Sequence, residues 1–180
     1  MDYESVNSVL SQFAKFGFRK TSMDDIARAA GLSRQSVYNR FGSKEGAFKW
    51  ALSAFLQHIL EAATSALSDN KASPKEALLA AYQHWIGDHV EMIISTDHGM
   101  ELMEQAIQSS QEATTDAEDT FYSAVASFLI KHEMISPPNI AIAADVTFAL
   151  SAASKGLMMK TRTPQEFADA MRRVVDAVLR

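Results

Sequence analysis

The spacing of apolar residues predicts a chain built from helices. Between residues 43 and 67, apolar side chains recur every three or four positions: Phe48, Leu52, Phe55, Ile59 and Ala63. This spacing places them on one face of a long helix. Helix start signals recur along the chain, and no segment has the strict alternation of a half-buried strand. We therefore expect an all-α fold of about nine helices.

The later helices have clear start signals. Ser73 and Thr163 are each followed by a proline and, three residues on, by a glutamate. Each run combines an N-cap, a proline at the first helical position and a capping-box acid. The first of these helices is expected to extend to about Ile93. Residues 139–159 are rich in alanine, which lets another helix approach closely.

Residues 21–48 are expected to form two short helices around a glycine turn. Ser22 and Asp25 have the spacing of a capping box at the start of the first helix. Gly31 can end that helix with a positive φ, and Ser33 can cap the next. This order is typical of a helix-turn-helix, which places its second helix in the DNA major groove. The outward-facing residues of that helix are Arg34, Gln35, Ser36, Tyr38, Asn39 and Arg40.

The charge is divided unevenly along the chain. Residues 1–50 hold eight Lys or Arg and five Asp or Glu, a net charge of +3, so the remainder carries −8 of the overall −5. A positive head is attracted to phosphate, while an acidic body is repelled and orients the encounter with DNA. An excess of three charges is also within ordinary variation.

The runs SMDDIA, AGLS, VYNRF and SKE together resemble the N-terminal domain of TetR-family transcriptional regulators, over about residues 5–50. The resemblance implies a DNA-binding domain at residues 1–48 and a ligand-binding and dimerisation domain at residues 49–180. It further implies a homodimeric repressor that binds an inverted-repeat operator on double-stranded DNA and is released by a small hydrophobic or aromatic effector. Asp2 and Glu4 stand where the family often has basic residues, so no basic arm is expected.

Within the head, the predicted DNA contacts follow from side-chain chemistry. Ser33 with its helix N-terminus, Tyr38, Lys44 and Thr21 are expected at phosphates. Arginine suits guanine edges and glutamine suits adenine edges, so Arg34 and Gln35 are the expected base readers. Asn39, near the helix end, is expected at a base, a sugar or the backbone. The predicted set is Thr21, Ser33, Arg34, Gln35, Tyr38, Asn39 and Lys44.

In the resembled family the middle helices bind a small inducer. Here they hold many aromatic and methionine side chains, which suit an adaptable apolar pocket but also form ordinary core. His89 is the polar candidate, because it lies on the apolar stripe. The predicted effector-binding residues are Trp85, His89, Met92, Met103, Phe121, Phe128 and Phe148.

The last two helices are the predicted dimer interface. The resembled family usually dimerises by pairing two such helices with their copies in a four-helix bundle. The alternative is that both helices only close the core of one subunit. The predicted interface residues are Ala149, Ala153, Gly156, Phe167, Met171, Val174 and Val178.

Enzyme chemistry is not expected. The chain has no glycine-rich phosphate loop, no GxSxG elbow and no cysteine. We expect neither a cofactor nor a metal, although His98, Glu101 and Glu104 are spaced to share a helix face. No run of about 18 apolar residues and no signal-peptide pattern was found, which favours the cytoplasm. Two alternatives remain: a DNA-bound adaptor or activator with a protein-docking body, and a helical-bundle enzyme or metal protein.

Overall fold

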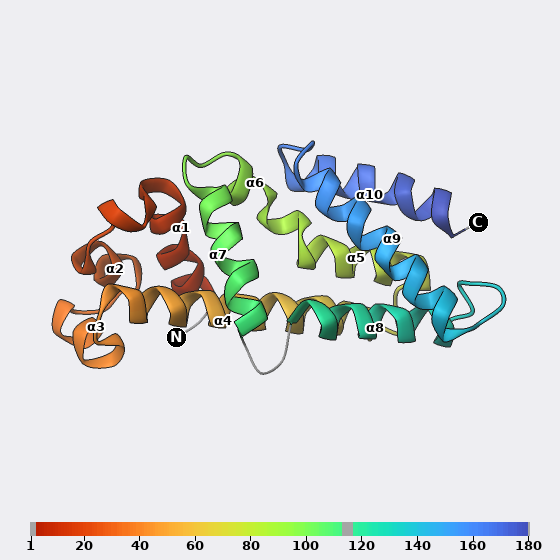
Figure 1. The fold of residues 1–180 in the computed structure, drawn as a ribbon, viewed down its shortest axis with the longest axis horizontal. Helices are drawn as coiled ribbons and strands as arrows, with labels where there is room; N and C mark the ends of the chain where they lie inside the picture. The colour runs from red at the N-terminus through yellow and green to blue at the C-terminus, as the bar shows by residue number, and fades with distance from the viewer. Residues whose placement is uncertain (1–2, 113–116, 180) are drawn as a thin grey trace. The chain divides into compact units, whose positions relative to one another are not determined.

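The computed structural model describes residues 3–112 and 117–179, and the fold is all-helical, as predicted (Figure 1). These residues form ten α-helices and one short 3₁₀ helix, where about nine helices were expected. The elements are α1 (Tyr3–Lys20), α2 (Met23–Ala29), α3 (Arg34–Phe41), α4 (Lys44–Leu67), α5 (Pro74–Trp85), η1 (Gly87–His89), α6 (Val90–Ile94), α7 (Gly99–Glu112), α8 (Ala117–Lys131), α9 (Ile140–Met158) and α10 (Pro164–Val178).

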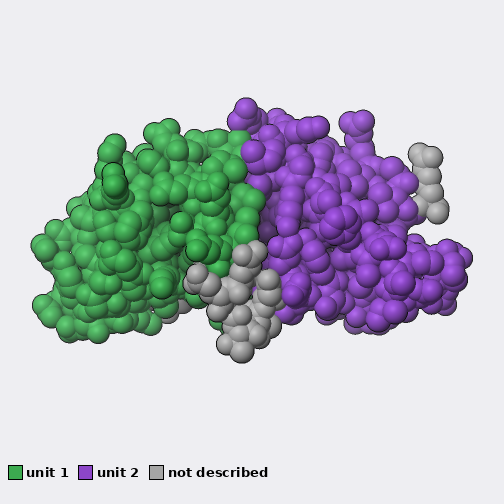
Figure 2. Space-filling view, viewed as in Figure 1, with its two compact units in different colours: residues 1–58, 92–114 green, residues 59–91, 115–180 purple. Residues whose placement is uncertain are grey.

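The chain divides into two compact units, each discontinuous in sequence (Figure 2). Unit 1 comprises Met1–His58 and Met92–Thr114, and unit 2 comprises Ile59–Glu91 and Thr115–Arg180. The division therefore does not fall at residue 48: α4 contributes residues to both units, and α7 joins the unit that holds the three N-terminal helices.

Unit 1 is organised around α1, which packs against α2 and α7. The apolar face of α1 is buried and includes Phe13, whose ring lies edge-on to Phe48 at a centroid distance of 4.8 Å. At Gly17 the helix is kinked, with φ of 77°. The backbone N–H of His98 donates to the carbonyl of Ala14 at 2.9 Å, and a Cβ at Gly17 would lie 2.9 Å from the His98 ring. Glycine at the kink therefore allows this close approach.

Unit 2 contains α5, α8, α9 and α10, in which α9 packs against both α8 and α10 and α10 also packs on α5 (Figure 1). Tyr82 of α5 is fully buried, and its hydroxyl lies 3.1 Å from Ser151 Oγ of α9. Burial raises the pKa of Tyr82, so the phenol stays neutral. Arg172 Nη2 donates to Glu76 Oε2 at 2.9 Å and ties α10 to the first turn of α5.

The helix expected from Ser73 to about Ile93 is broken in the structure, which accounts for the higher helix count. It ends at Trp85, and η1 and α6 follow. Gly87 lies in the break, where a Cβ would come within 2.5 Å of Cδ1 of Phe167. The packing of α10 against this segment thus uses a position without a side chain, and helical periodicity alone does not reveal it.

One helix among the described residues, α9, is long and apolar enough to cross a membrane, a feature that the search for an uninterrupted apolar run missed. The charged residues Asp145 and Lys155 interrupt it. Its buried side includes Leu150 and Ser154 and packs within unit 2 against α8 and α10. Only 28% of the apolar window of α9 is buried, so the helix packs within unit 2 by one face.

Candidate nucleic-acid interface

The segment from α2 to α3 forms the predicted helix-turn-helix. Ser22 and Asp25 form a reciprocal capping box: the Asp25 N–H donates to Ser22 Oγ at 3.2 Å, and the Ser22 N–H donates to Asp25 Oδ2 at 3.0 Å. The hydrogen bonds from Ser22 lower the pKa of Asp25, which keeps a negative charge at the positive end of α2. Gly31 has φ of 65° and reverses the chain, and the Leu32 N–H donates to the Ala27 carbonyl at 2.9 Å.

The second helix is anchored at both ends. Ser33 caps α3 by accepting the Ser36 N–H at 3.1 Å, and Val37 is fully buried beneath it. The ring of Phe41 lies 4.7 Å from the ring of Trp50 on α4. Gly42, with φ of 72°, ends the helix. These contacts fix which face of α3 points outward.

The outward face of α3 is polar and cationic. Arg34, Gln35, Ser36, Tyr38, Asn39 and Arg40 are all exposed. Gln35 Nε2 donates to Asn39 Oδ1 at 2.8 Å, one turn along the helix, which holds the two amide side chains in a shared orientation. Exposed amides and guanidinium groups on a short helix have the donors and acceptors that base edges and phosphates pair with.

Arg34 has a partner that the sequence reasoning missed. Its Nε lies 3.1 Å from Asp24 Oδ1 and its Nη1 donates to Asp24 Oδ2 at 3.2 Å. Its guanidinium also lies 5.7 Å from the centre of the Tyr38 ring. The pKa of Arg34 is raised, first by a hydrogen bond with the Tyr38 side chain and then by the charge of Asp24. The first turn of α2 thus orients the side chain predicted to read a base.

Lys44 holds the start of α4 against the end of α1. Its Nζ donates to the carbonyls of Phe18 at 2.8 Å and Arg19 at 3.3 Å and lies 4.6 Å from the centre of the Phe18 ring. The ammonium has three protons, so these bonds leave one for a phosphate. The phosphate contact by Lys44 stays a prediction, and the residue also has a structural role in joining α4 to the end of α1.

The placement of Thr21 corrects the predicted set of phosphate contacts. Its side chain is only 2% exposed, and its hydroxyl donates to the Gly17 carbonyl at 2.8 Å. A hydroxyl has one proton to donate, so this bond leaves none for a phosphate. The next residue, Ser22, is exposed, but its hydroxyl donates its own proton to Asp25 Oδ2 at 2.6 Å.

The predicted effector-binding residues divide between the two units and, within unit 2, between core and surface. Phe121 and Phe128 are buried in unit 2, where Phe121 stacks on the half-buried Trp85 at 4.6 Å. His89 is also buried, with Nε2 3.1 Å from the His84 carbonyl. Phe148 is 70% exposed. Met92 and Met103 lie in unit 1, where Met92 Sδ accepts a hydrogen bond from Ser11 at 3.9 Å.

The predicted dimer residues divide between surface and core. Ala149 and Gly156 are exposed, Ala153 and Val174 are half-buried, and Val178 is exposed at the end of α10. Phe167 and Met171 are instead packed in the core of unit 2, so the prediction is wrong for these two residues. They carry the apolar stripe that attaches α10 to its own subunit.

A capped helix, a glycine turn and a second helix with an exposed polar face define a helix-turn-helix DNA-binding domain. Residues 10–49 match the family model described as "Bacterial regulatory proteins, tetR family". Residues 10–49 therefore form a TetR-type DNA-binding domain, as the sequence motifs predicted, and the family that this domain defines is one of transcriptional regulators rather than of enzymes.

Curated relatives match parts of the chain. It is 30% identical over 106 residues to the HTH-type transcriptional repressor KstR2 of Mycobacterium tuberculosis, a match that covers 57% of this chain and 52% of KstR2. It is 30% identical over 67 residues to the HTH-type transcriptional regulator AlkX of the same species, covering 37% of this chain and 32% of AlkX. The chain therefore matches about half or less of the length of these relatives.

Solved structures share the fold over nearly the whole chain. A transcriptional regulator from Rhodococcus sp. Rha1 has a TM-score of 0.68 at 20% identity, covering 99% of this chain and 96% of its own. The TetR-family regulator PfmR from Thermus thermophilus has a TM-score of 0.61 at 21% identity, covering 97% and 96%. At this level of identity the similarity concerns the fold of both units.

Proposed function

We propose that this protein is a cytoplasmic DNA-binding transcriptional repressor that binds an inverted-repeat operator as a homodimer and is released by a small, largely apolar effector. The observation that carries the proposal is the exposed polar face of α3. The buried Val37 and the glycine turn determine which side of α3 is exposed. The matched relatives KstR2 and AlkX, named as a transcriptional repressor and a transcriptional regulator, support it.

The dimer sets the geometry of the operator. Each subunit presents one α3, so two recognition helices related by a two-fold axis would read two half-sites about one duplex turn, about 34 Å, apart or somewhat further. The net charge of +3 on residues 1–50 favours approach of the heads to the phosphate backbone.

Base readers and phosphate contacts are separable by salt titration on a matched operator and a scrambled duplex. We expect Arg34→Ala or Gln35→Ala to lower operator affinity about 10-fold and scrambled-duplex affinity much less, because each would lose about 1–3 kcal/mol of base discrimination. Lys44→Ala should weaken both duplexes alike and reduce the salt slope by about one.

Thermal unfolding of each variant is the control, since Lys44 also bonds to the carbonyls of Phe18 and Arg19. Selection of bound fragments from a random duplex pool supplies the operator, and its symmetry tests the dimer at the same time. Equal losses on both duplexes from all three variants would remove Arg34 and Gln35 from the set of base readers.

Effector release would act through α4. This helix begins beside the recognition helix and contributes its last turns, residues 59–67, to unit 2, so a change in its position would alter the spacing of the two heads. Ligand and operator would then weaken each other's binding by the same factor. Operator affinity that is unchanged at saturating effector would contradict this switch.

The dimer surface is testable at an exposed position of α9. Ala149 is exposed, so Ala149→Arg should leave the fold of the subunit intact while placing a charge in the proposed interface. We expect the dimer dissociation constant to rise at least 10-fold, measured by light scattering across a dilution series. Ser65→Arg, at a position on α4 that is also exposed, is the matched control and should leave the dimer unchanged.

A further inference from the structure

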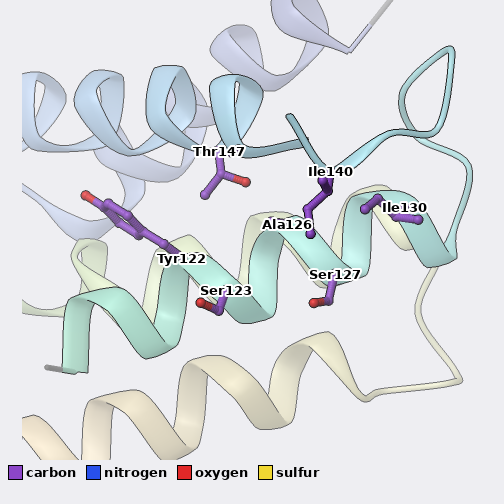
Figure 3. A pocket seen from close by; sticks show the side chains of 8 residues that line it. Tyr122, Ser123, Ala126, Ser127, Ile130, Ile140 and Thr147 are labelled. Atoms are coloured by element: carbon purple, nitrogen blue, oxygen red, sulfur yellow. The ribbon is translucent and has the colours of Figure 1, made fainter. Parts of the chain in front are cut away.

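A groove lies between α8 and α9 in unit 2 (Figure 3). It has a volume of about 320 Å³, at the lower end of the range for small-molecule sites. Its walls are alanine and isoleucine side chains together with hydroxyl-bearing residues. The lining residues are Tyr122, Ser123, Ala126, Ser127, Ile130, Ile140, Ala144 and Thr147.

Thr147 stands in the wall of this groove with an unpaired hydroxyl. The residue is 2% exposed, and its Oγ1 is buried without a hydrogen-bond partner. Figure 3 shows its side chain projecting from α9 toward α8. A buried hydroxyl without a partner is unfavourable, and most buried polar atoms avoid this cost.

Other threonines of this chain avoid that cost by bonding to their own helix. Thr64, Thr96 and Thr161 each donate to the carbonyl four residues earlier, at 2.7, 2.6 and 2.9 Å. Thr147 lies within a regular helix and has the same option. Its hydroxyl instead borders the groove, where a bound molecule would meet it.

The lining defines the chemistry of a ligand. None of the eight lining residues is charged at neutral pH. Beside the lining residue Tyr122, Lys155 of α9 forms an ion pair with Glu118 of α8, which also accepts a hydrogen bond from Tyr122. A charged ligand would lose hydration in the groove without a lining residue of opposite charge to pair with.

We propose that the α8–α9 groove binds an uncharged, largely apolar small molecule through a hydrogen bond from Thr147 Oγ1 to a ketone, ester or amide oxygen of the ligand. This proposal identifies a binding site for the effector of the proposed function. Binding of the molecule in the groove does not depend on the proposed function, whereas release of the protein from DNA by that molecule does. None of the aromatic residues that the sequence suggested lines the groove, and Phe121 stacks on Trp85 instead.

The test uses the full chain without DNA, so that a failure of this site is distinct from a failure of DNA binding. Nile red, an uncharged dye with a carbonyl oxygen, reports occupancy by fluorescence, and butyrophenone and butylbenzene compete for the site. The two competitors differ in the ketone oxygen. We expect the inhibition constant of butyrophenone against the dye to be about 5- to 10-fold lower than that of butylbenzene. This ratio corresponds to one net hydrogen bond in a buried site.

Thr147→Val should abolish this preference while leaving the protein as stable or more stable, because it removes an unpaired hydroxyl and keeps the shape. Thr161→Val is the matched control: its hydroxyl bonds to the Leu157 carbonyl, so it should lose stability and keep the preference. Ala144→Phe should block the dye, whereas Ala66→Phe, in the groove between α4 and α5, should not.

Three results would overturn the proposal. One is an unchanged preference for butyrophenone in Thr147→Val. Another is dye binding that is insensitive to Ala144→Phe. The third is dye binding that disappears as the protein self-associates on concentration, which would mean that a second copy covers the groove.

Discussion

Gly46→Ala is expected to destabilise the protein by about 3 kcal/mol, although alanine ordinarily favours a helix by about 1 kcal/mol over glycine. Gly46 lies in the first turn of α4, and a Cβ there would overlap the backbone carbonyl oxygen of Phe41, the last residue of α3. Backbone atoms cannot move aside as a flexible side chain would, so the junction of the recognition helix with α4 must open. Thermal unfolding monitored by circular dichroism should show a midpoint lower by about 10 °C.

Two other glycines supply matched controls for this effect. Gly156 is also helical, but a Cβ there meets nothing within 4 Å, so Gly156→Ala should raise stability by about 0.5–1 kcal/mol. Gly42 has open space but a φ of 72°, so Gly42→Ala should cost about 1 kcal/mol. If Gly46→Ala stabilised the protein as Gly156→Ala is expected to, the close approach of α4 to Phe41 would be disproved.

The helix-turn-helix was predictable because local chemistry determines it. The Ser22–Asp25 capping box, the positive φ at Gly31 and the Ser33 cap each depend on residues within a few positions of one another. Short-range hydrogen bonds and glycine conformations can be inferred from sequence spacing. The exposed face of α3 then followed from the burial of Val37.

The predictions that failed or stayed incomplete depend on contacts between distant segments. Asp24 orients Arg34 from ten residues away, and Lys44 bonds to carbonyls 25 and 26 residues earlier. Thr21 was placed at the DNA surface because it precedes a helix, but its side chain lies beneath the turn, bonded to Gly17. Residue type and helical spacing do not specify which partners tertiary packing brings together.

The body was harder to interpret because its informative residues are chemically ordinary. The sequence drew attention to large aromatic and methionine side chains, which mostly form core. The α8–α9 groove is lined mainly by alanine, serine and threonine, and these residue types carry no distinctive signal along a helix. Only the packing of α8 against α9 creates the space and leaves the Thr147 hydroxyl unpaired.

Phe121 and Phe148 were both predicted to bind an effector. Replacing each with alanine should show which of the two stabilises the core. Phe121 is fully buried, stacks on Trp85 at 4.6 Å and meets the Tyr82 ring edge-on at 5.3 Å. Phe121→Ala should therefore destabilise the protein by about 3–5 kcal/mol, through lost burial and the cavity left behind. The unfolding midpoint should fall by about 10 °C or more, by about 2–4 °C for each kcal/mol.

Phe148→Ala is the matched control, since the same atoms are removed from a side chain that is 70% exposed. Its effect on the free energy of unfolding should stay within about 0.5 kcal/mol. A side chain that already faces an open cavity has fewer contacts to lose, so an effector-lining Phe121 would cost much less than about 3 kcal/mol on truncation. If both variants lost similarly little free energy of unfolding, the assignment of Phe121 to the core would be contradicted. Phe121 would then again be a candidate for the effector site.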